Sequence, residues 1–197
     1  MNLLKFHSKS LVIIVFLWLL TGRGQILQAK SEKRYEVSLY TGIPEVARLG
    51  ESYRSLTKNI KIPFTPIDVT KDPMLLQSGI VSGIDFESIG AKVYFKQGIS
   101  CLIMLQPPFK GVIKTKQVQL FDTPKPSTMN WKELIIKELG QPTTQGTGSI
   151  LGGDVYYYPW GDIEISRIGL RQLMLYRDRS ILEYRQALKT NVIKLFK

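Results

Sequence analysis

The clearest hydrophobic pattern in the chain lies within residues 91–111. Residues 93–95 (Val-Tyr-Phe) suit a pleated surface, Gln97-Gly98 supplies turn chemistry, and 99–105 is an apolar run of strand length closed by two prolines. This pattern predicts a β-hairpin whose second strand is buried on both faces.

The spacing of apolar positions predicts further strands and helices on both sides of this hairpin. Strands are expected over 35–40, 83–87, 112–121, 155–160, 162–168 and 170–177. Helices are expected over 44–58, 131–139 and 181–194, where apolar residues recur at helical spacing. The prolines within 59–78 predict an irregular connection there.

The order of these elements predicts the fold class and the domain organisation. We expect an α+β fold in which an antiparallel sheet of strand meanders, formed within 83–121 and 155–177, carries the helices on one face. Residues 30–197 are long enough to form this sheet and its core as a single domain.

A repeated unit is one explanation of this order. The two halves would be 35–106 and 107–179, followed by a C-terminal helix over 180–197. Val93 precedes Leu105 by as many residues as Ile163 precedes Leu175. The alternative is two unrelated helix-then-sheet stretches within one domain.

The first 29 residues have the three regions of a secretory signal peptide. Lys5 and Lys9 precede the apolar run 11–20, and polar and small residues lead to a cleavage point after Ala29. This run is about half of the roughly 20 residues that a spanning helix needs. We therefore expect export to the periplasm or the cell exterior; the alternative is an uncleaved N-terminal anchor.

The charge balance narrows the class of partner. The chain has 27 Lys and Arg against 16 Asp and Glu, and cleavage after Ala29 removes three cations and no acid, which leaves a net charge of +8. This excess favours an envelope polymer, an acidic lipid surface or an acidic protein face, and we expect no nucleic-acid partner for an exported protein. The alternative is a basic surface that serves solubility only.

The scarcity of cysteine and histidine limits the chemistry. Cys101 is the single cysteine, so no internal disulfide forms, and its place in the apolar run predicts a buried small hydrophobe. His7, the single histidine, lies in the predicted signal peptide. We therefore expect neither a histidine-dependent nucleophile nor a histidine or cysteine zinc site, and no cofactor.

Two carboxylate pairs are the remaining candidates for catalysis. Asp85 with Glu87, and Asp162 with Glu164, are spaced so that both members of a pair point the same way from a strand. Such pairs serve glycoside hydrolysis or bind hard cations. The alternative, which we favour, is that they cover the solvent face of half-buried strands.

Aromatic residues provide the candidate binding surface. The most concentrated group is Tyr156, Tyr157, Tyr158 and Trp160. Alternation places Tyr157 opposite Tyr156 and Tyr158, and exposed tyrosine and tryptophan are preferred contact residues. The alternative, which the tendency of aromatic strands to pack favours, is that these rings lie in the core. The basic C-terminal helix similarly has two interpretations: contact with an anionic surface, or docking on the sheet.

The layout resembles a known fold family. The residues that carry the resemblance are few: Leu139-Gly140-Gln141-Pro142, the echo Leu49-Gly50-Glu51-Ser52, and the strand endings 102–105 and 172–175. This arrangement, given twice behind a signal peptide, resembles the β-lactamase-inhibitor-protein fold and the small lipoprotein of the outer-membrane β-barrel assembly machinery. The echo lacks the proline, and the lipidated cysteine of the lipoprotein has no counterpart. The resemblance implies an antiparallel sheet backed by helices that binds other proteins, and it assigns no site residues.

The sequence therefore predicts an exported, non-enzymatic protein of the cell envelope or exterior. It would bind a protein partner through a sheet face or the aromatic group. The alternatives are an acid-dependent hydrolase and a structural envelope protein that holds anionic polymer by charge.

Overall fold

Eight antiparallel strands in one sheet form the centre of the computed structural model, which describes residues 33–113, 118–120, 131–147, 153–166 and 172–195, with side chains of the last helix to residue 187. The described elements belong to a compact unit over 34–197. The predicted signal peptide, 1–29, lies outside the described residues. No helix within the described part of the chain is both long and apolar enough to cross a membrane.

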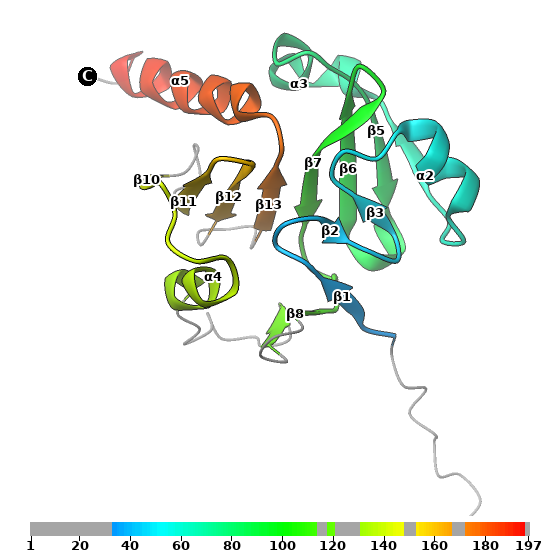
Figure 1. The fold of residues 1–197 in the computed structure, drawn as a ribbon. Helices are drawn as coiled ribbons and strands as arrows, with labels where there is room; N and C mark the ends of the chain where they lie inside the picture. The colour runs from blue at the N-terminus through cyan, green and yellow to red at the C-terminus, as the bar shows by residue number, and fades with distance from the viewer. Residues whose placement is uncertain (1–32, 114–117, 121–130, 148–152, 167–171, 196–197) are drawn as a thin grey trace, which may run out of the picture. The chain divides into compact units, whose positions relative to one another are not determined.

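The sheet consists of two four-stranded meanders that meet side by side (Figure 1). Its order is β10 (Thr144–Thr147), β11 (Gly153–Tyr158), β12 (Gly161–Ser166), β13 (Gln172–Tyr176), β7 (Ile99–Leu105), β6 (Ala91–Lys96), β5 (Ile80–Phe86) and β4 (Thr65–Ile67). Every neighbouring pair is antiparallel. With the helices described below, this arrangement confirms the predicted α+β fold.

The predicted central hairpin is present as β6 and β7. Gln97 (φ 53°) and Gly98 (φ 75°) both adopt left-handed conformations, which suits a two-residue turn that matches the twist of the strands. Ile103 and Leu105 of β7 pack on one face of the sheet, and Leu102 packs on the other. The prediction that this strand is buried on both faces is confirmed.

Helices lie on both faces of the sheet, so the prediction of a single helical face is wrong. On one face, α2 (Tyr53–Asn59) and α4 (Trp131–Leu139) bury Leu56, Leu134 and Ile135. On the other, α3 (Pro73–Gln77) and α5 (Arg179–Leu195) contribute Leu75, Ile181 and Leu182. The physical reason is that β7, β12 and β13 are buried on both sides and need cover on both.

The segment 44–58 is helical only in its last part, so the prediction of one helix over these residues is wrong. That stretch contains part of the pair β2 (Gly42–Ile43) and β3 (Ala47–Arg48), and helix begins only at Tyr53. Gly50 has φ 83°, a left-handed conformation that interrupts a right-handed helix, and the Ser52 hydroxyl caps α2 by accepting from Ser55 N at 3.1 Å.

Two predicted strands lie outside the main sheet. β1 (Tyr35–Val37) pairs in parallel with β8 (Gly111–Ile113), and β8 pairs with β9 (Val118–Leu120). The expected irregular connection over 59–78 contains β4, a 3-10 turn η1 (Val69–Lys71) and α3. Pro73 begins α3 rather than preventing it, because the first helical position needs no N–H donor.

Each of the two meanders runs in chain order from an outer edge of the sheet to its centre. β6 begins at residue 91 and β12 at residue 161, a separation of 70. Met104 and Met174, also separated by 70, face each other where β7 and β13 meet. This geometry agrees with the predicted repeat, and common descent of the two halves stays a prediction.

Candidate functional site

Two of the four predicted aromatic contact residues lie in the core. Tyr156 and Tyr158 are 2% and 3% exposed and pack in the cluster beneath α2 and α4. The prediction that they contribute to a contact surface is therefore wrong. The physical reason is that α4 covers the face of β11 towards which both rings point.

Tyr157 points to the opposite face, as alternation predicted, and two side chains of α5 contact it. Its hydroxyl accepts a hydrogen bond from Gln186 Nε2 at 2.8 Å. The Arg179 guanidinium lies 5.4 Å from the centre of its ring, within the range of a cation–π contact. Tyr157 is half-buried and holds α5 on the sheet.

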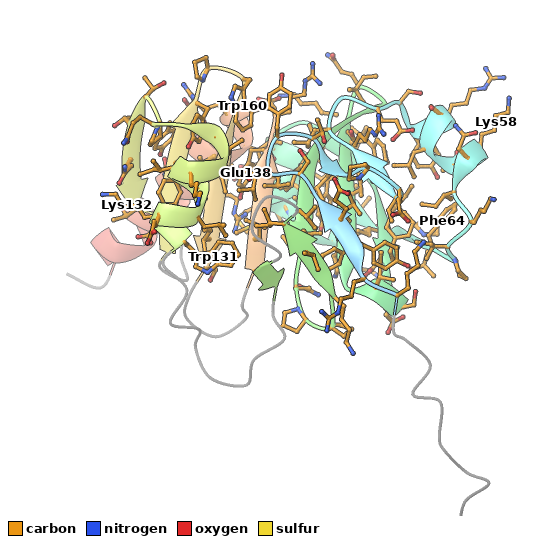
Figure 2. The ribbon with its side chains drawn as sticks, turned by 60° about the horizontal axis from the view of Figure 1, so that its bottom comes forward. Lys58, Phe64, Trp131, Lys132, Glu138 and Trp160 are labelled. Atoms are coloured by element: carbon orange, nitrogen blue, oxygen red, sulfur yellow. The ribbon has the colours of Figure 1, made fainter. Side chains whose placement is uncertain are left out.

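Trp160 extends from the buried rings towards the surface and meets a residue that the sequence analysis did not select. It stacks on Tyr158 with ring centres 5.0 Å apart and an interplanar angle of 16°. The ring of Tyr40, in the turn between β1 and β2, meets Trp160 nearly edge-on at 4.6 Å. We call Tyr158, Trp160 and Tyr40 the aromatic column, which leads from the core to the surface (Figure 2 labels Trp160).

Local backbone contacts position each end of the aromatic column. The Tyr158 hydroxyl donates to the carbonyl of Gly140 at the end of α4, at 3.0 Å. The Ser38 hydroxyl accepts from the backbone N–H of Tyr40 and of Thr41, which holds the turn that presents Tyr40. Tyr40 is 53% exposed and Trp160 is half-buried. No pattern around Tyr40 distinguishes it in the sequence, because its partner is 120 residues away.

Asp162 and Glu164 point the same way from β12, as predicted, and both are 1% exposed. Arg179 of α5 binds Asp162 with two contacts, Nη2 to Oδ1 at 2.8 Å and Nε to Oδ2 at 3.0 Å. The interpretation that these acids face solvent is wrong. α5 covers this face of β12 and brings arginines to the carboxylates.

Glu164 belongs to a second buried group under α5. It accepts a hydrogen bond from the Tyr176 hydroxyl at 2.6 Å, and Arg185 Nη1 lies 3.6 Å from its carboxylate. Burial raises the pKa of Tyr176 well above its ordinary value, so the hydroxyl stays protonated and able to donate. The hydrogen bond to Asp162 raises the pKa of Arg179. These acids stabilise the attachment of α5.

The other predicted acid pair does not form. Asp85 makes an ion pair with Lys92 at 3.2 Å, across neighbouring strands. Glu87 lies beyond the end of β5, exposed in the 3-10 turn η2 (Glu87–Ile89). The strand ends before the second acid, so the alternation that would align the two carboxylates does not apply.

Cys101 is a buried small hydrophobe, as predicted. It is 5% exposed, and its thiol lies 3.4 Å from the Tyr94 carbonyl oxygen. Burial raises the pKa of the thiol to about 12, so it is protonated at neutral pH. Within the described residues, no group of three or more histidine, cysteine or acidic side chains is placed to hold a metal ion.

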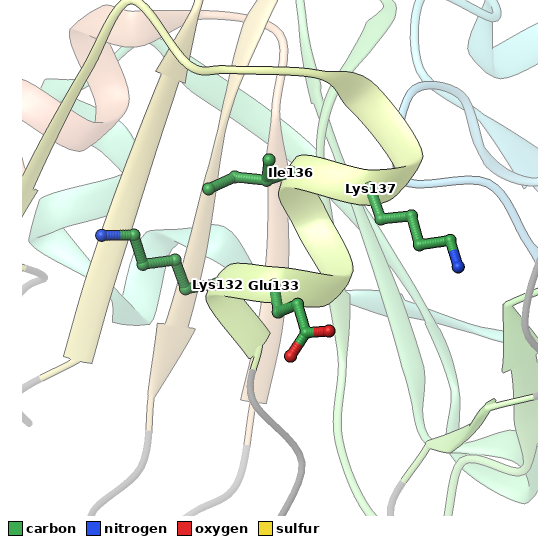
Figure 3. Close-up of a pocket in the computed structure, with 4 residues that line it drawn as sticks. All are labelled: Lys132, Glu133, Ile136 and Lys137. Atoms are coloured by element: carbon green, nitrogen blue, oxygen red, sulfur yellow. The ribbon is translucent and has the colours of Figure 1, made fainter.

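A shallow depression on the outward side of α4 is lined by Lys132, Glu133, Ile136 and Lys137 (Figure 3). All four come from two turns of one helix, and the two lysines point away from each other. It is an open surface and lacks the converging polar groups of a ligand pocket.

No protein-family model, curated protein or solved structure matches this chain. The resemblance to the β-lactamase-inhibitor-protein fold therefore stays a prediction.

Proposed function

We propose that this chain is an exported, non-enzymatic binding protein that recognises another protein through Trp160 and Tyr40. The observation that carries the proposal is the aromatic column, which presents a 53% exposed tyrosine and a half-buried tryptophan at one place on the surface. These two residue types are enriched among the contacts that dominate binding energy in protein interfaces.

The aromatic column is ordered before any partner arrives. Trp160 is held by its stack on Tyr158, and Tyr158 is fixed in turn by its bond to Gly140. Binding through a ring that is already held loses less side-chain entropy than binding through a mobile one. Tyr40 adds a hydroxyl at the rim, where a hydrogen bond to a partner remains compatible with solvent.

The burial of Asp162 and Glu164 and their pairing with arginines argue against the hydrolase alternative. A general acid or nucleophile must reach its substrate, and a glycosidase acid also needs a neighbour that tunes it for proton transfer. Asp162 and Glu164 are buried, and each lies beside an arginine of α5. We therefore assign them a structural role.

Affinity capture tests the proposal. The tagged, processed protein should recover one protein from envelope extract in stoichiometric amount, and recovery should persist as salt is raised because apolar contacts are not screened. Replacing Tyr40 and Trp160 together by alanine should weaken capture roughly 30-fold or more, as expected for loss of an interface anchor. Leu76→Ala is the matched control, because Leu76 is 42% exposed on α3, and it should leave capture unchanged.

Three results would overturn the proposal. Equal capture by the double variant and the wild type would remove the role of the aromatic column. Recovery of material that disappears with salt, without a discrete protein, would favour the envelope polymer alternative. Turnover of a glycan or peptide substrate that Asp162→Asn abolishes, in a variant that still folds, would establish the hydrolase.

A further inference from the structure

Cations without an acidic partner gather around α2. Arg48, Arg54, Lys58 and Lys61 are all exposed, and none of them forms an ion pair within the described residues. Arg177 joins them because its Nη1 donates to the carbonyl of Leu49 at 3.3 Å, and it also lacks an ion pair there. We call these five residues the basic arc.

Cations elsewhere in the described chain are mostly paired. Lys71, Lys92 and Lys96 lie 3.4, 3.2 and 2.6 Å from carboxylates, and Arg179 and Arg185 also have acid partners. Outside the basic arc, only Lys132 and Lys137 on α4 have neither an ion pair nor another side-chain contact among the described residues. Within the described part of the chain, the basic arc is therefore the largest group of cations without an ion pair.

The sequence around α2 contains almost no acidic residues that could neutralise the basic arc. Glu51 is the only acid among residues 46–67. Its carboxylate accepts from the Ser55 hydroxyl at 3.1 Å and from the Arg48 backbone N–H at 3.3 Å, so it supports the backbone at the start of α2. Arg54 and Lys58 lie one turn apart, a spacing at which like charges destabilise a helix. Figure 2 shows Lys58 extending outwards from α2.

Apolar side chains accompany these cations. Ile60, Ile62 and Phe64 pack against the core but are only partly buried, and Pro63 is exposed, so part of their apolar area lies beside Lys61 just after α2. Segments that lie on membranes combine cations with apolar side chains, and the residues after α2 offer both at the surface. A soluble polyanion needs the charges alone.

We infer that the basic arc is a contact site for an anionic phospholipid surface. This inference is independent of the aromatic column: it assigns a second surface that holds the protein against a membrane while Tyr40 and Trp160 remain the protein-binding site. Each cation near a lipid surface changes membrane affinity by about fivefold, so the five cations of the arc together attract an anionic surface strongly.

Vesicle sedimentation tests the inference with the processed protein. The probe is a phosphatidylcholine vesicle with about a third phosphatidylglycerol, compared with pure phosphatidylcholine at low and high salt. Binding should occur on the anionic vesicles and weaken as salt rises, because the attraction is screened. The variant Arg54→Gln, Lys58→Gln, Lys61→Gln should bind them roughly 100-fold less tightly. These side chains are exposed, so the variant should keep the wild-type unfolding transition.

A matched triple variant separates the basic arc from the overall charge. Lys71→Gln, Lys132→Gln, Lys137→Gln removes the same charge from exposed positions elsewhere and should retain most of the binding. Equal loss in the two variants would overturn the inference, and so would equal binding to neutral vesicles. A third contrary result is binding to dextran sulfate, lost in the first variant, without binding to vesicles.

The failure of this inference is distinguishable from that of the proposed function. The Tyr40→Ala, Trp160→Ala double variant should bind vesicles like the wild type. If it loses vesicle binding while the basic-arc variant keeps it, the lipid contact belongs to the aromatic column and the inference is wrong.

Discussion

Tyr40 and Trp160 show how a surface site forms from single residues that are distant in the sequence. Each is an ordinary turn residue in its own segment, and their rings meet because the β1–β2 turn packs against the β11–β12 hairpin. The sequence pointed to Trp160 through its run of neighbouring tyrosines. It could not point to Tyr40, because pairing across such a distance leaves no local pattern.

Glu164 provides a test of the buried polar groups. Glu164→Gln should lower the free energy of unfolding by about 2 kcal/mol, because it removes the charge of a buried carboxylate that lies beside the partly buried Arg185. Glu87→Gln is the matched control, since Glu87 is exposed, and it should change stability by less than about 0.5 kcal/mol. Urea unfolding of the two variants measures the difference. Equal stability of the two would show that Glu164 does not stabilise the attachment of α5.

Cys101 should resist thiol reagents in the folded protein. It is 5% exposed, and burial raises the pKa of its thiol to about 12, so little thiolate exists at pH 8. A chromogenic disulfide reagent should react fully in concentrated urea and only very slowly in buffer. Fast reaction of the native protein would contradict the buried position.

At the scale of elements, local signals located most strands and helices correctly. The apolar run closed by two prolines located the central hairpin, and α4 has its predicted bounds at Trp131 and Leu139. α5 begins at Arg179, two residues before its prediction. These elements succeeded because their turn and cap residues agree with their apolar spacing.

The elements that were missed depend on contacts that no local pattern reports. Apolar residues do recur at helical spacing over 44–58. Gly50 and the pairing of β2 with β3 nevertheless restrict the helix to the last part of this segment. The burial of Asp162 and Glu164 depends on where α5 docks, which the alternation of β12 could not reveal.

Two substitutions of Asp178, at the start of α5, test how much its capping bond and its ion pair contribute to stability. The Asp178 carboxylate accepts from Ser180 N at 3.0 Å, a capping bond, and lies 2.6 Å from Lys96 Nζ. Asp178→Asn keeps a capping side chain and should cost up to about 1 kcal/mol. Asp178→Ala loses the cap as well and should cost about 1 kcal/mol more. Urea denaturation ranks the two, and equal stability of both variants would show that the cap contributes nothing.

Acidification should remove the advantage of Asp178 over asparagine. Burial alone would raise the pKa of Asp178, but hydrogen bonds from Lys96 and Ser180 outweigh it and lower the pKa below 3.8. The ionised carboxylate therefore stabilises the fold above the ordinary pKa, and this contribution is lost as pH falls through the lowered value. The difference between wild type and Asp178→Asn should be constant near neutral pH and shrink below pH 3.8.

At the scale of the whole molecule, the two meanders share one sheet and differ in what they present. The second half carries Trp160 at the end of the β11–β12 hairpin, and it carries the buried acids under α5. Most of the basic arc lies on the first half. The two surfaces that we propose therefore differ in kind: one offers apolar area and the other offers charge.

Stability should decline in alkaline solution because several buried groups must stay protonated. Burial raises the pKa of Cys101 and of Tyr94 to about 12, and raises that of Tyr176 well above its ordinary value. Between about pH 9 and 12 the unfolded chain loses protons that the folded chain keeps, so the free energy of unfolding falls as pH rises. Urea midpoints measured from pH 7 to 11 should fall above pH 9, and Cys101→Ala should reduce the slope. A flat profile would contradict the burial of these groups.

The central claim is that Tyr40 and Trp160 form the surface that meets a protein partner. Its most direct test is photo-crosslinking in the cells that produce the protein, with benzoylphenylalanine placed at position 40 and, as the control, at position 76 on α3. We expect one discrete crosslinked protein from position 40, lost when Trp160 is also replaced by alanine, and none from position 76. Equal labelling from both positions, or no adduct at position 40, would contradict the claim.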